Sequence, residues 1–482
     1  MGEQDPVVEK KPSNYLLSEE QREIYRRFAR LALPRHTSYP IAAVWTPTFG
    51  PAQFATDLAT GREAGQPVSL YVHIPFCQQL CYYCACTKEI IPPQKRRECD
   101  PAEGLLEHLE LEAGRIANLL GPRPVEQLHL GGGSPTFLTP AQLERLGEIL
   151  ARHFVLTNHG ERAVEVDPRV TTREHLETLR GLGFNRISLG VQDFSPRVQQ
   201  AVHRQQPFEM VQQCVETVRS LGFGSINFDL IYGLPFQTLD SMADTLEKTL
   251  RLAPDRVAFY RLAVIPEIFR WQNVFRPDDL PGGDIPLDLN LLAIQTFLEA
   301  GYDFIGLDHF ARPDEALFQA REAGTLRRNF QGMTTRKDLE IVGLGPSAIS
   351  QLESAFAQNH KDTADWSRAV RADLGTERGM HLTVEDRLRQ EVLQQLYGHG
   401  EVDLGEPAAR LGLSYAEAFA DDLPRLDDLS GEGLLTRQGS RLHLTTPLGR
   451  LLVRVVASVF DRYLPRDAYR NGLPSQQASR VG

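Results

Sequence analysis

The chain has 482 residues, a formal net charge of −11, and a composition that is 41% hydrophobic and 24% charged. This length predicts two or three domains, and the acidic balance argues against a protein that binds nucleic acid or an anionic membrane. The sequence shows no signal-peptide pattern and no apolar run of about 18 residues, so we expect a cytoplasmic protein that does not enter a membrane.

The first 50 residues form the first predicted unit. They predict a helix, "SEEQREIYRRFARLAL", followed by an extended arm, "PRHTSYPIAAVWTP". The apolar residues of the helical segment recur three and four positions apart, which is the period of an amphipathic helix.

Residues 51–360 form the second predicted unit, in which short β-rich runs alternate with helical patterns. The predicted strands are "SLYVHI", "EQLHL", "RAVEV", "RISLG", "SINFDLIY" and "RVAFYRL". Strands that alternate with helices predict an α/β fold with a parallel sheet, either open or closed into a partial barrel.

Polar and glycine-rich motifs follow four of these strands. They are "CQQLCYYCAC", "GGGSPT", "GVQDF" and "GLPFQT". Parallel α/β sheets bind ligands at the carboxyl ends of their strands, so we expect these motifs to meet in one site. Residues 361–482 are more polar and helical, with one hairpin-like run, "GLLTRQGSRLHLTT", and predict a separate, mostly α-helical domain.

Four of the six cysteines lie within ten residues: Cys77, Cys81, Cys84 and Cys86. Crowded thiols indicate a soft metal, either zinc or an iron–sulfur cluster. Structural zinc usually takes two separated pairs of ligands, and no second pair follows here. A set of six cysteines grouped in this way also differs from a secreted disulfide framework. The C-x3-C-x2-C spacing favours three thiolate ligands with one open iron, and leaves Cys86 for another role.

The stretch "YVHIPFCQQLCYYCAC" resembles the radical S-adenosylmethionine (SAM) superfamily and, more narrowly, the oxygen-independent coproporphyrinogen III oxidase (dehydrogenase) family. The resemblance extends over residues 33–350 through "PRHTSYP", "LGGGSPTFL", "EVDPR", "RISLGVQDFSPRVQQAVHR", "NFDLIYGLP", "GLDHFARPDE", "RRNFQGMTT" and "GLGPSAIS". It implies a partial (β/α)6 TIM-like radical SAM barrel with an N-terminal extension and a mostly helical C-terminal domain.

The resemblance also implies the cofactors, the reaction and the partners. Cys77, Cys81 and Cys84 would hold a [4Fe–4S] cluster whose open iron binds SAM, and the family holds two SAM molecules per chain. The implied reaction converts two propionates of coproporphyrinogen III to vinyl groups through a 5′-deoxyadenosyl radical, giving protoporphyrinogen IX. It needs a low-potential electron donor and an electron acceptor, neither of which the sequence identifies. We expect a monomer.

By the same resemblance, Tyr71 and Glu165 contact the cluster-bound SAM, and Cys86 joins them as a candidate catalytic residue. The other matched cofactor positions are Tyr83, Gly132, Gly133, Ser134, Gln192, Arg204, Asp229, Ala263 and Ile349. Taken alone, several have ordinary structural interpretations: Tyr71 as a core aromatic, Glu165 as a surface acid, and Arg204 as an exposed helix arginine. Gln192 and Asp229 end apolar strands, where a buried polar group usually has a ligand or a hydrogen-bonding network.

A substrate with four propionates predicts a cationic pocket. The candidates are Arg35, Arg261, Arg327 and Arg328, with His309 as a donor or a structural histidine, whereas the run from Lys95 to Arg97 is more typical of a solvated face. His36, Arg261 and Val264 depart from the family pattern. Two alternatives therefore stay open: a paralogue that is a haem chaperone or acts on another tetrapyrrole, and a metal-binding regulator with a DNA-binding C-terminal module. Cys86 argues against the chaperone, and the acidic balance argues against the regulator.

Overall fold

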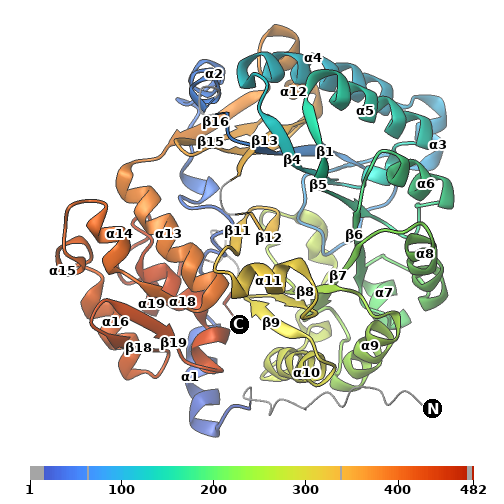
Figure 1. Cartoon of the computed structure of the whole chain (residues 1–482). Coiled ribbons are helices and arrows are strands. Elements are labelled where there is room, and N and C mark those ends of the chain that lie inside the picture. The colour runs from blue at the N-terminus through green and yellow to red at the C-terminus, as the bar shows by residue number, and fades with distance from the viewer. Residues whose placement is uncertain (1–15, 62–64, 337–338, 475–479, 482) are drawn as a thin grey trace, which may run out of the picture.

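The computed structural model describes residues 16–61, 65–336, 339–474 and 480–481. Its central element is a twelve-stranded sheet with the order β16-β15-β14-β13-β1-β4-β5-β6-β7-β8-β10-β9 (Figure 1). The strands at its centre are β1 (Val68–Ile74), β4 (Pro124–Gly132), β5 (Val155–Val166), β6 (Arg186–Gln192), β7 (Ser225–Tyr232) and β8 (Arg256–Arg261). The flanking strands are β9 (Asp303–Gly306), β10 (His309–Ala311), β13 (Glu340–Leu344), β14 (Ile349–Gln351), β15 (Ala355–Asn359) and β16 (Thr376–His381).

The six predicted strands are the six central strands, and they pair with one another in parallel. The α/β prediction is therefore confirmed. All seven residues of β1 are buried, as expected for a parallel strand that is covered on both faces. The structure adds one parallel strand that sequence patterns did not indicate, β13, which pairs with β1 from Val68 opposite Glu340 to Val72 opposite Leu344.

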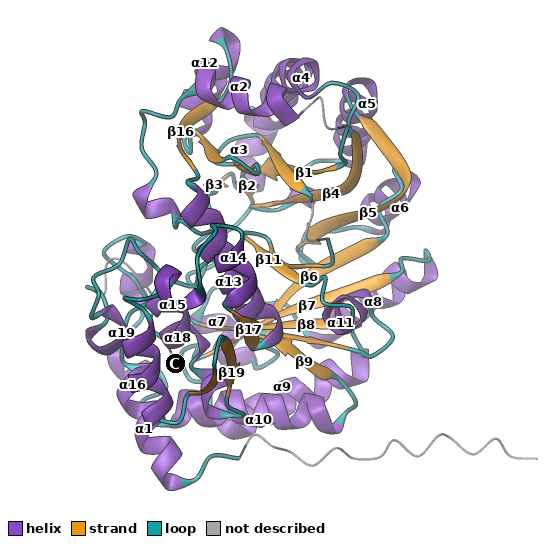
Figure 2. Cartoon of the chain, turned by 60° about the vertical axis from the view of Figure 1, so that its left-hand side comes forward, coloured by secondary structure: helices purple, strands orange, loops and turns teal. Residues whose placement is uncertain are grey.

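The sheet is curved and open, with helices on its outer face (Figure 2). Among the described residues its outermost strands, β16 and β9, do not pair with each other, so the barrel is partial. The helices of this unit are α2 (Pro51–Thr60), α3 (Pro93–Glu98), α4 (Pro101–Leu120), α5 (Pro140–His153), α6 (Arg173–Gly181), α7 (Pro196–Ala201), α8 (Phe208–Ser220), α9 (Leu239–Leu252), α10 (Ile285–Glu299), α11 (Ala316–Glu322) and α12 (Thr363–Ala372). Threonine side chains cap α5, α6 and α9 and fix where these helices begin.

A second apolar core lies beside the sheet and is mostly helical. Its elements are α13 (Val384–His399), α14 (Gly405–Ala409), α15 (Tyr415–Ala418), α16 (Leu423–Gly431), α17 (Leu448–Leu451), α18 (Val453–Val459), α19 (Ala468–Asn471) and a small sheet of β17 (Glu401–Asp403), β19 (Arg441–Leu444) and β18 (Leu435–Gln438). The predicted hairpin is the antiparallel pair of β18 and β19.

The N-terminal helix α1 (Glu19–Ala29) belongs to this second core, because Tyr25 and Phe28 share one apolar cluster with Leu388 and Phe460. The large sheet continues through β16 to His381. We therefore propose that the division between the two cores lies near residue 382, beyond the predicted position of 360.

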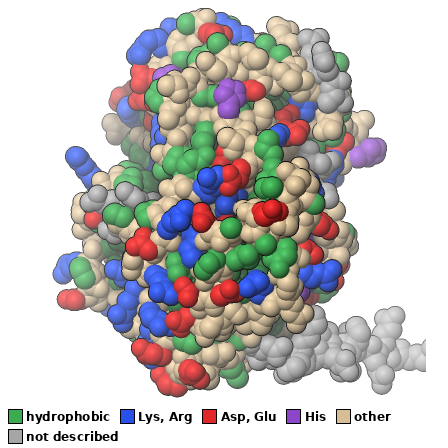
Figure 3. All heavy atoms as spheres, turned by 90° about the vertical axis from the view of Figure 1, so that its left-hand side faces the viewer, with side chains coloured by type: hydrophobic (Ala, Val, Ile, Leu, Met, Phe, Trp, Pro, Cys, Tyr) green, Lys and Arg blue, Asp and Glu red, His purple; other side chains and the backbone are tan. Residues whose placement is uncertain are grey.

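The surface of the second core mixes basic and acidic side chains on the face shown in Figure 3. The net charge of −11 is thus not gathered into one acidic field on this face. Within the described ranges, no helix has the length and apolarity needed to cross a membrane.

Candidate active site

The crowded cysteines lie on one loop at the carboxyl end of β1. The loop runs from β2 (Phe76–Cys77) to β3 (Glu89–Ile90), and these two short strands pair in parallel. Cys77, Cys81 and Cys84 line a common cavity of about 170 Å³. Glycines at the end of β4 and polar groups after β5 and β6 line the same cavity, as expected from the shared orientation of parallel strand ends.

Several hydrogen bonds to backbone groups hold this loop. Lys88 donates from Nζ to the carbonyls of Cys84 (3.1 Å) and Cys86 (3.2 Å), and Trp271 donates from Nε1 to the same Cys84 carbonyl (3.2 Å). On the other side, His203 Nδ1 lies 2.8 Å from the carbonyl of Leu80. Because both ends and the middle of the loop are tied down, the thiols are positioned before any ligand binds.

Two arginines contact the buried Cys81. Arg169 Nη2 lies 3.4 Å and Arg204 Nη1 lies 3.6 Å from Cys81 Sγ. Both guanidiniums also pair with Asp167, at 2.6 and 3.2 Å. Burial opposes the charge of Asp167, but Arg204 and Arg169 outweigh it and hold the pKa of this carboxyl well below its usual value. Both guanidiniums thus lie within hydrogen-bonding distance of a sulfur that can act as a metal ligand.

The donor set fits an iron–sulfur cluster better than a single metal ion. In the described part of the chain no three His, Cys, Asp or Glu side chains converge closely enough to hold one ion. The three thiols instead surround a shared cavity, as ligands of irons at separate corners of a cluster must. Three sulfur ligands without a fourth protein ligand leave one corner open for a further ligand.

Glycine backbone closes the cavity next to the thiols. A Cβ on Gly133 would lie 2.8 Å from the carbonyl oxygen of Phe76, and a Cβ on Gly132, which has φ of +113°, would lie 2.7 Å from the His73 ring. Only glycine allows this conformation and this close approach. The exposed peptide groups at this point can bind the polar end of an amino-acid-like ligand.

Glu165 lies beside the glycines, at the end of β5. It accepts a hydrogen bond from Gly132 N (3.3 Å), and its Oε1 lies 3.1 Å from His129 Nε2. Burial disfavours its charge, but His129 and the backbone N–H of Gly132 outweigh burial and lower the pKa of Glu165. The carboxylate is therefore ionised and can bind an ammonium group or ribose hydroxyls.

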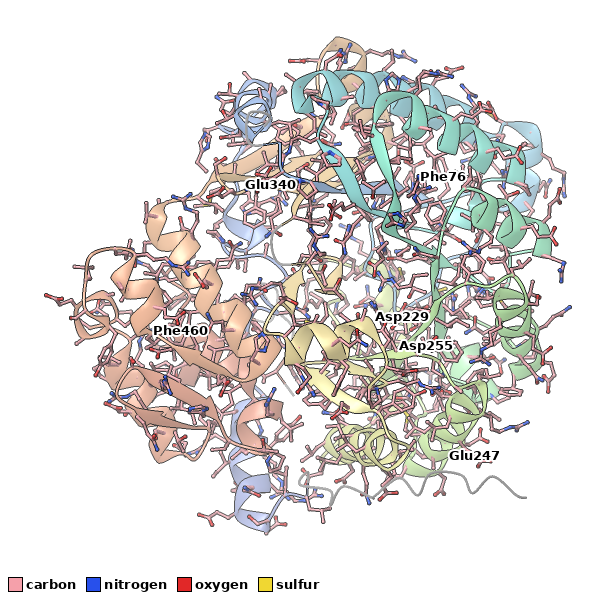
Figure 4. The ribbon with its side chains drawn as sticks, viewed as in Figure 1. Phe76, Asp229, Glu247, Asp255, Glu340 and Phe460 are labelled. Atoms are coloured by element: carbon pink, nitrogen blue, oxygen red, sulfur yellow. The ribbon has the colours of Figure 1, made fainter. Side chains whose placement is uncertain are left out.

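A second cavity, of about 330 Å³, continues from the first into the barrel. The two cavities share Tyr83, Cys84, Cys86, Glu165, Ser188, Gln192 and Asp229. Asp229 lies inside the barrel on β7 (Figure 4) and accepts hydrogen bonds from Ser188 Oγ (3.1 Å) and Asn227 Nδ2 (3.0 Å). Burial and the nearby Glu165 raise the pKa of Asp229 to about 6.

The structure brings most of the predicted site residues together, but not all. The ones that line the two joined cavities are Cys77, Cys81, Tyr83, Cys84, Cys86, Gly132, Gly133, Ser134, Glu165, Gln192, Arg204 and Asp229. Tyr71 lies on β1 with its hydroxyl 3.0 Å from His73 Nδ1, and does not line either cavity. Ala263 lines a different cavity together with Arg261 and Val264, and Ile349 lies on β14, outside the linings of these three cavities.

The predicted substrate cations have different environments. Arg327 donates to the carbonyls of Gly324 and Leu326, and Arg35 pairs with Asp308 at 3.0 Å. In the basic run on α3, Arg96 bonds Asp100 and Gln142 and therefore stabilises the fold. His309 lines the larger cavity.

Sequence reasoning missed several residues of the site: Asp167, Arg169, His129 and Ser188. Asp167 and Arg169 lie in the motif "EVDPR", in which only Glu165 had been assigned. Their position just after a strand was a usable signal, because residues at that place face the site in a parallel sheet. His129 alternates with buried apolar residues on β4, and this pattern alone does not tell which face of the strand lines a cavity.

Comparisons with known proteins agree with this geometry. A family profile described as "Radical SAM superfamily" matches residues 71–249. The oxygen-independent coproporphyrinogen III oxidase of Pseudomonas aeruginosa is 41% identical over 462 residues, covering 95% of this chain and 98% of the relative. The enzyme of the same description from Escherichia coli K12 is 40% identical over 450 residues, covering 93% and 95%. A solved structure of the Escherichia coli coproporphyrinogen III oxidase, described as a radical SAM enzyme, has a TM-score of 0.85 and 39% identity, and covers 90% of this chain and 100% of that chain.

Proposed function

The chain belongs to the oxygen-independent coproporphyrinogen III oxidase family of the radical SAM superfamily, and from this we propose how its residues carry out that family's step of haem synthesis. It acts by a radical SAM mechanism on coproporphyrinogen III. The finer reaction that we infer is oxidative decarboxylation of two propionates to vinyl groups, giving protoporphyrinogen IX. Membership of this family of enzymes sets aside the alternative of a DNA-binding regulator.

Cys77, Cys81 and Cys84 would hold the [4Fe–4S] cluster, and the glycines after β4 and Glu165 would hold the cluster-bound SAM. When bound, the cluster and SAM would supply a 5′-deoxyadenosyl radical able to remove a β-hydrogen from a propionate. Loss of carbon dioxide and transfer of one electron to an external acceptor would then leave a vinyl group. The observation that carries this assignment is that three thiols, glycine backbone and an ionised Glu165 surround one cavity.

The protein's own residues orient the ligands and balance their charge. Arg169 and Arg204 compensate negative charge at Cys81. The two cavities join at a passage lined by residues that belong to both, among them Asp229, Ser188 and Gln192. Buried polar groups such as these need hydrogen-bond partners, either from a ligand or from a neighbouring side chain. Cys86 lies in the same passage, so it is placed between the cluster cavity and the interior of the barrel.

We propose that the second cavity accounts for the second SAM of the family. Support comes from the positions of Tyr83, Gln192 and Asp229, which line both cavities and therefore face a ligand beside the first. Equilibrium dialysis of the reconstituted protein against labelled SAM measures this directly. Two equivalents per chain are expected, with loss of one equivalent in Asp229→Ala. A single equivalent in the wild-type protein would contradict the proposal.

Anaerobic turnover tests the function. The reconstituted protein is mixed with dithionite, SAM and coproporphyrinogen III, and both 5′-deoxyadenosine and the porphyrin products are followed. Protoporphyrin is expected together with 5′-deoxyadenosine, and Cys77→Ser is expected to abolish both. Cleavage of SAM without decarboxylation would leave a radical enzyme with another substrate, and would turn attention to the departures at Arg261 and Val264.

A further inference from the structure

Among the residues that the structure describes, Arg328 is a buried cation without a hydrogen-bonded or ionic partner. It is 4% exposed, and its Nε and Nη1 atoms are buried without a hydrogen-bond acceptor. Within the described part of the chain its guanidinium forms no ion pair, and its closest aromatic contact is the Tyr397 ring, at 5.9 Å from the centroid. Burying a charged group without hydrogen bonds costs several kcal/mol, so such a group normally has a ligand.

The backbone around Arg328 is rigidly fixed. Arg328 lies in β11 (Arg327–Asn329), which forms a hairpin with β12 (Gly332–Thr334). Gln394 of α13 accepts from Arg328 N and donates to Arg328 O, both at 2.6 Å. These two bonds mimic the pairing of an additional strand and hold the hairpin against the second core. The position of the guanidinium is therefore specified, although its hydrogen bonds are not made.

The surroundings of Arg328 have an excess of positive charge. After burial, the groups that act most strongly on its guanidinium are Asp308, Tyr260, Tyr397 and Arg35. Asp308 is already paired with Arg35 at 3.0 Å, so this group of side chains holds two guanidiniums and one carboxylate. In contrast, two other buried arginines that line the cavity of about 330 Å³ have ionic partners. Arg186 pairs with Glu161, and Arg256 pairs with Glu161 and Glu315.

His309 adds a second unsatisfied group beside Arg328. Its Nδ1 atom is buried without a partner, and its ring packs edge-on against Tyr260 with the centroids 5.8 Å apart. His309 and Tyr260 line the cavity of about 330 Å³ that Cys86 and Asp229 also line, and Arg328 lines an adjoining cavity of about 640 Å³. Asn329 and Thr334 of the hairpin line both. A carboxylate that enters where the two cavities adjoin, beside Asn329 and Thr334, would supply the acceptor that the buried nitrogens of His309 and Arg328 lack.

We propose that Arg328, together with Arg35 and His309, forms a carboxylate subsite that holds a propionate of the substrate other than the one undergoing decarboxylation. The proposal rests on the proposed function. A guanidinium accepts a carboxylate through two parallel hydrogen bonds, and the neutral imidazole supplies a third donor. The subsite would set which propionate faces the cluster, because anchoring one carboxylate fixes the rotation of the ring.

The first experiment measures binding separately from turnover. The anaerobic holoenzyme is titrated with coproporphyrin III, a stable tetracarboxylate, and with its tetramethyl ester, and binding is followed by fluorescence. The proteins are wild type, Arg328→Met, Arg328→Lys and a control, Arg321→Gln, whose arginine on α11 pairs with Glu322 and donates to the Phe304 carbonyl. We expect Arg328→Met to weaken binding of the acid by about 10- to 100-fold, the loss of a charge-assisted hydrogen-bonded pair, with no change for the ester. Arg328→Lys should lose less, and the control should match wild type.

A thermal unfolding series distinguishes a ligand-binding arginine from a structural one. Replacing an unpaired buried charge by an apolar side chain of similar length is expected to leave the melting temperature of Arg328→Met unchanged or higher. A structural role through Tyr397 would instead lower it. A lower melting temperature with unchanged affinity for coproporphyrin III would overturn the proposal.

Steady-state kinetics keep the subsite and the function apart. With coproporphyrinogen III we expect Arg328→Met to raise KM while formation of 5′-deoxyadenosine without substrate stays at the wild-type rate. If the wild type converts coproporphyrinogen III and Arg328→Met has the same KM as the wild type, the subsite is refuted and the function stands. If the wild type does not convert coproporphyrinogen III but binds the free acid more tightly than the ester, and Arg328→Met loses this binding, the function is refuted and the subsite is supported.

Discussion

At the scale of single residues, the pairing of Asp167 with two arginines is the main electrostatic feature of the cluster loop. Asp167 neutralises part of the charge of Arg169 and Arg204, which also donate to Cys81 Sγ. Without this carboxylate, two full positive charges would stand beside a thiolate ligand. The potential of a bound cluster depends on such nearby charges and on hydrogen bonds to its sulfurs.

Asp167→Asn is therefore expected to make the cluster easier to reduce and worse at reducing SAM. The removal of one buried negative charge should raise the midpoint potential on the order of tens of millivolts and slow the formation of 5′-deoxyadenosine. An anaerobic redox titration monitored by electron paramagnetic resonance measures the shift. Asp193→Asn is a matched control, because Asp193 is also a buried carboxylate but bonds Gln237 and Ser195. Equal potentials in both variants would contradict this account.

At the scale of elements, Glu112 joins helix α4 to the segment that follows β13. It accepts hydrogen bonds from Gly345 N (2.7 Å), Asn359 Nδ2 (2.8 Å) and Trp366 Nε1 (3.1 Å). Burial outweighs these three donors and raises the pKa of Glu112 to about 7. The protonated form is thus favoured in the folded protein relative to the unfolded chain.

This pKa predicts a pH dependence of stability. Because the pKa is higher in the folded state, the contribution of Glu112 is fully present below its ordinary pKa of 4.5 and is lost as the pH rises towards 7. From pH 5 to pH 7 the free energy of unfolding of the wild type should fall by about 2 kcal/mol more than that of Glu112→Gln, whose side chain does not titrate. Denaturant unfolding at the two pH values measures the difference. Parallel pH profiles for the two proteins would refute the assignment.

Sequence patterns predicted those elements whose local signal is strong. The six central strands are short buried apolar runs, and each was recognised, whereas β13 to β16 carry few buried β-branched residues and derive their pairing from the sheet itself. At the site, the thiol spacing alone indicated a cluster. The partnership of Asp167 with Arg169 and Arg204, and the missing partner of Arg328, depend on packing between segments far apart in the chain, and no local pattern contains that information.

At the scale of the whole molecule, the arm after α1 connects the two cores. Neighbouring residues reach in opposite directions: Arg35 bonds Asp308 beside the barrel, and His36 bonds Tyr397 (2.8 Å) and Asp461 (3.0 Å) in the second core. His36 is 3% exposed and has φ of +44°. Its departure from the family pattern is thus accommodated by two buried hydrogen bonds.

Replacing His36 with Phe should loosen this connection. The ring volume is kept, but Asp461 and Tyr397 lose their partner in a buried environment, which is expected to lower the free energy of unfolding by about 2 to 4 kcal/mol. Hydrogen exchange should increase in α13 and α18, while the central strands keep their protection. His443→Phe, at an exposed position of β19, serves as the control. Unchanged hydrogen exchange in α13 and α18 would show that the connection between the two cores does not depend on the hydrogen bonds of His36.

The packing of α1 against the second core also has a consequence for synthesis on the ribosome. The sheet is built from residues 68–381, so all of its strands are translated before α13 to α19 of the second core. Helix α1 is translated earlier and pairs with the start of α10 through Arg22 and Arg26, but most of its apolar partners lie in the last hundred residues, and Val481 N bonds the carbonyl of Leu31. At ~5–20 residues per second, the delay is on the order of a minute. During that time the apolar face of α1 lacks most of its partners and can bind chaperones. The strands of the barrel can therefore pair before the segment that carries Arg35 and His36 makes its contacts with the second core.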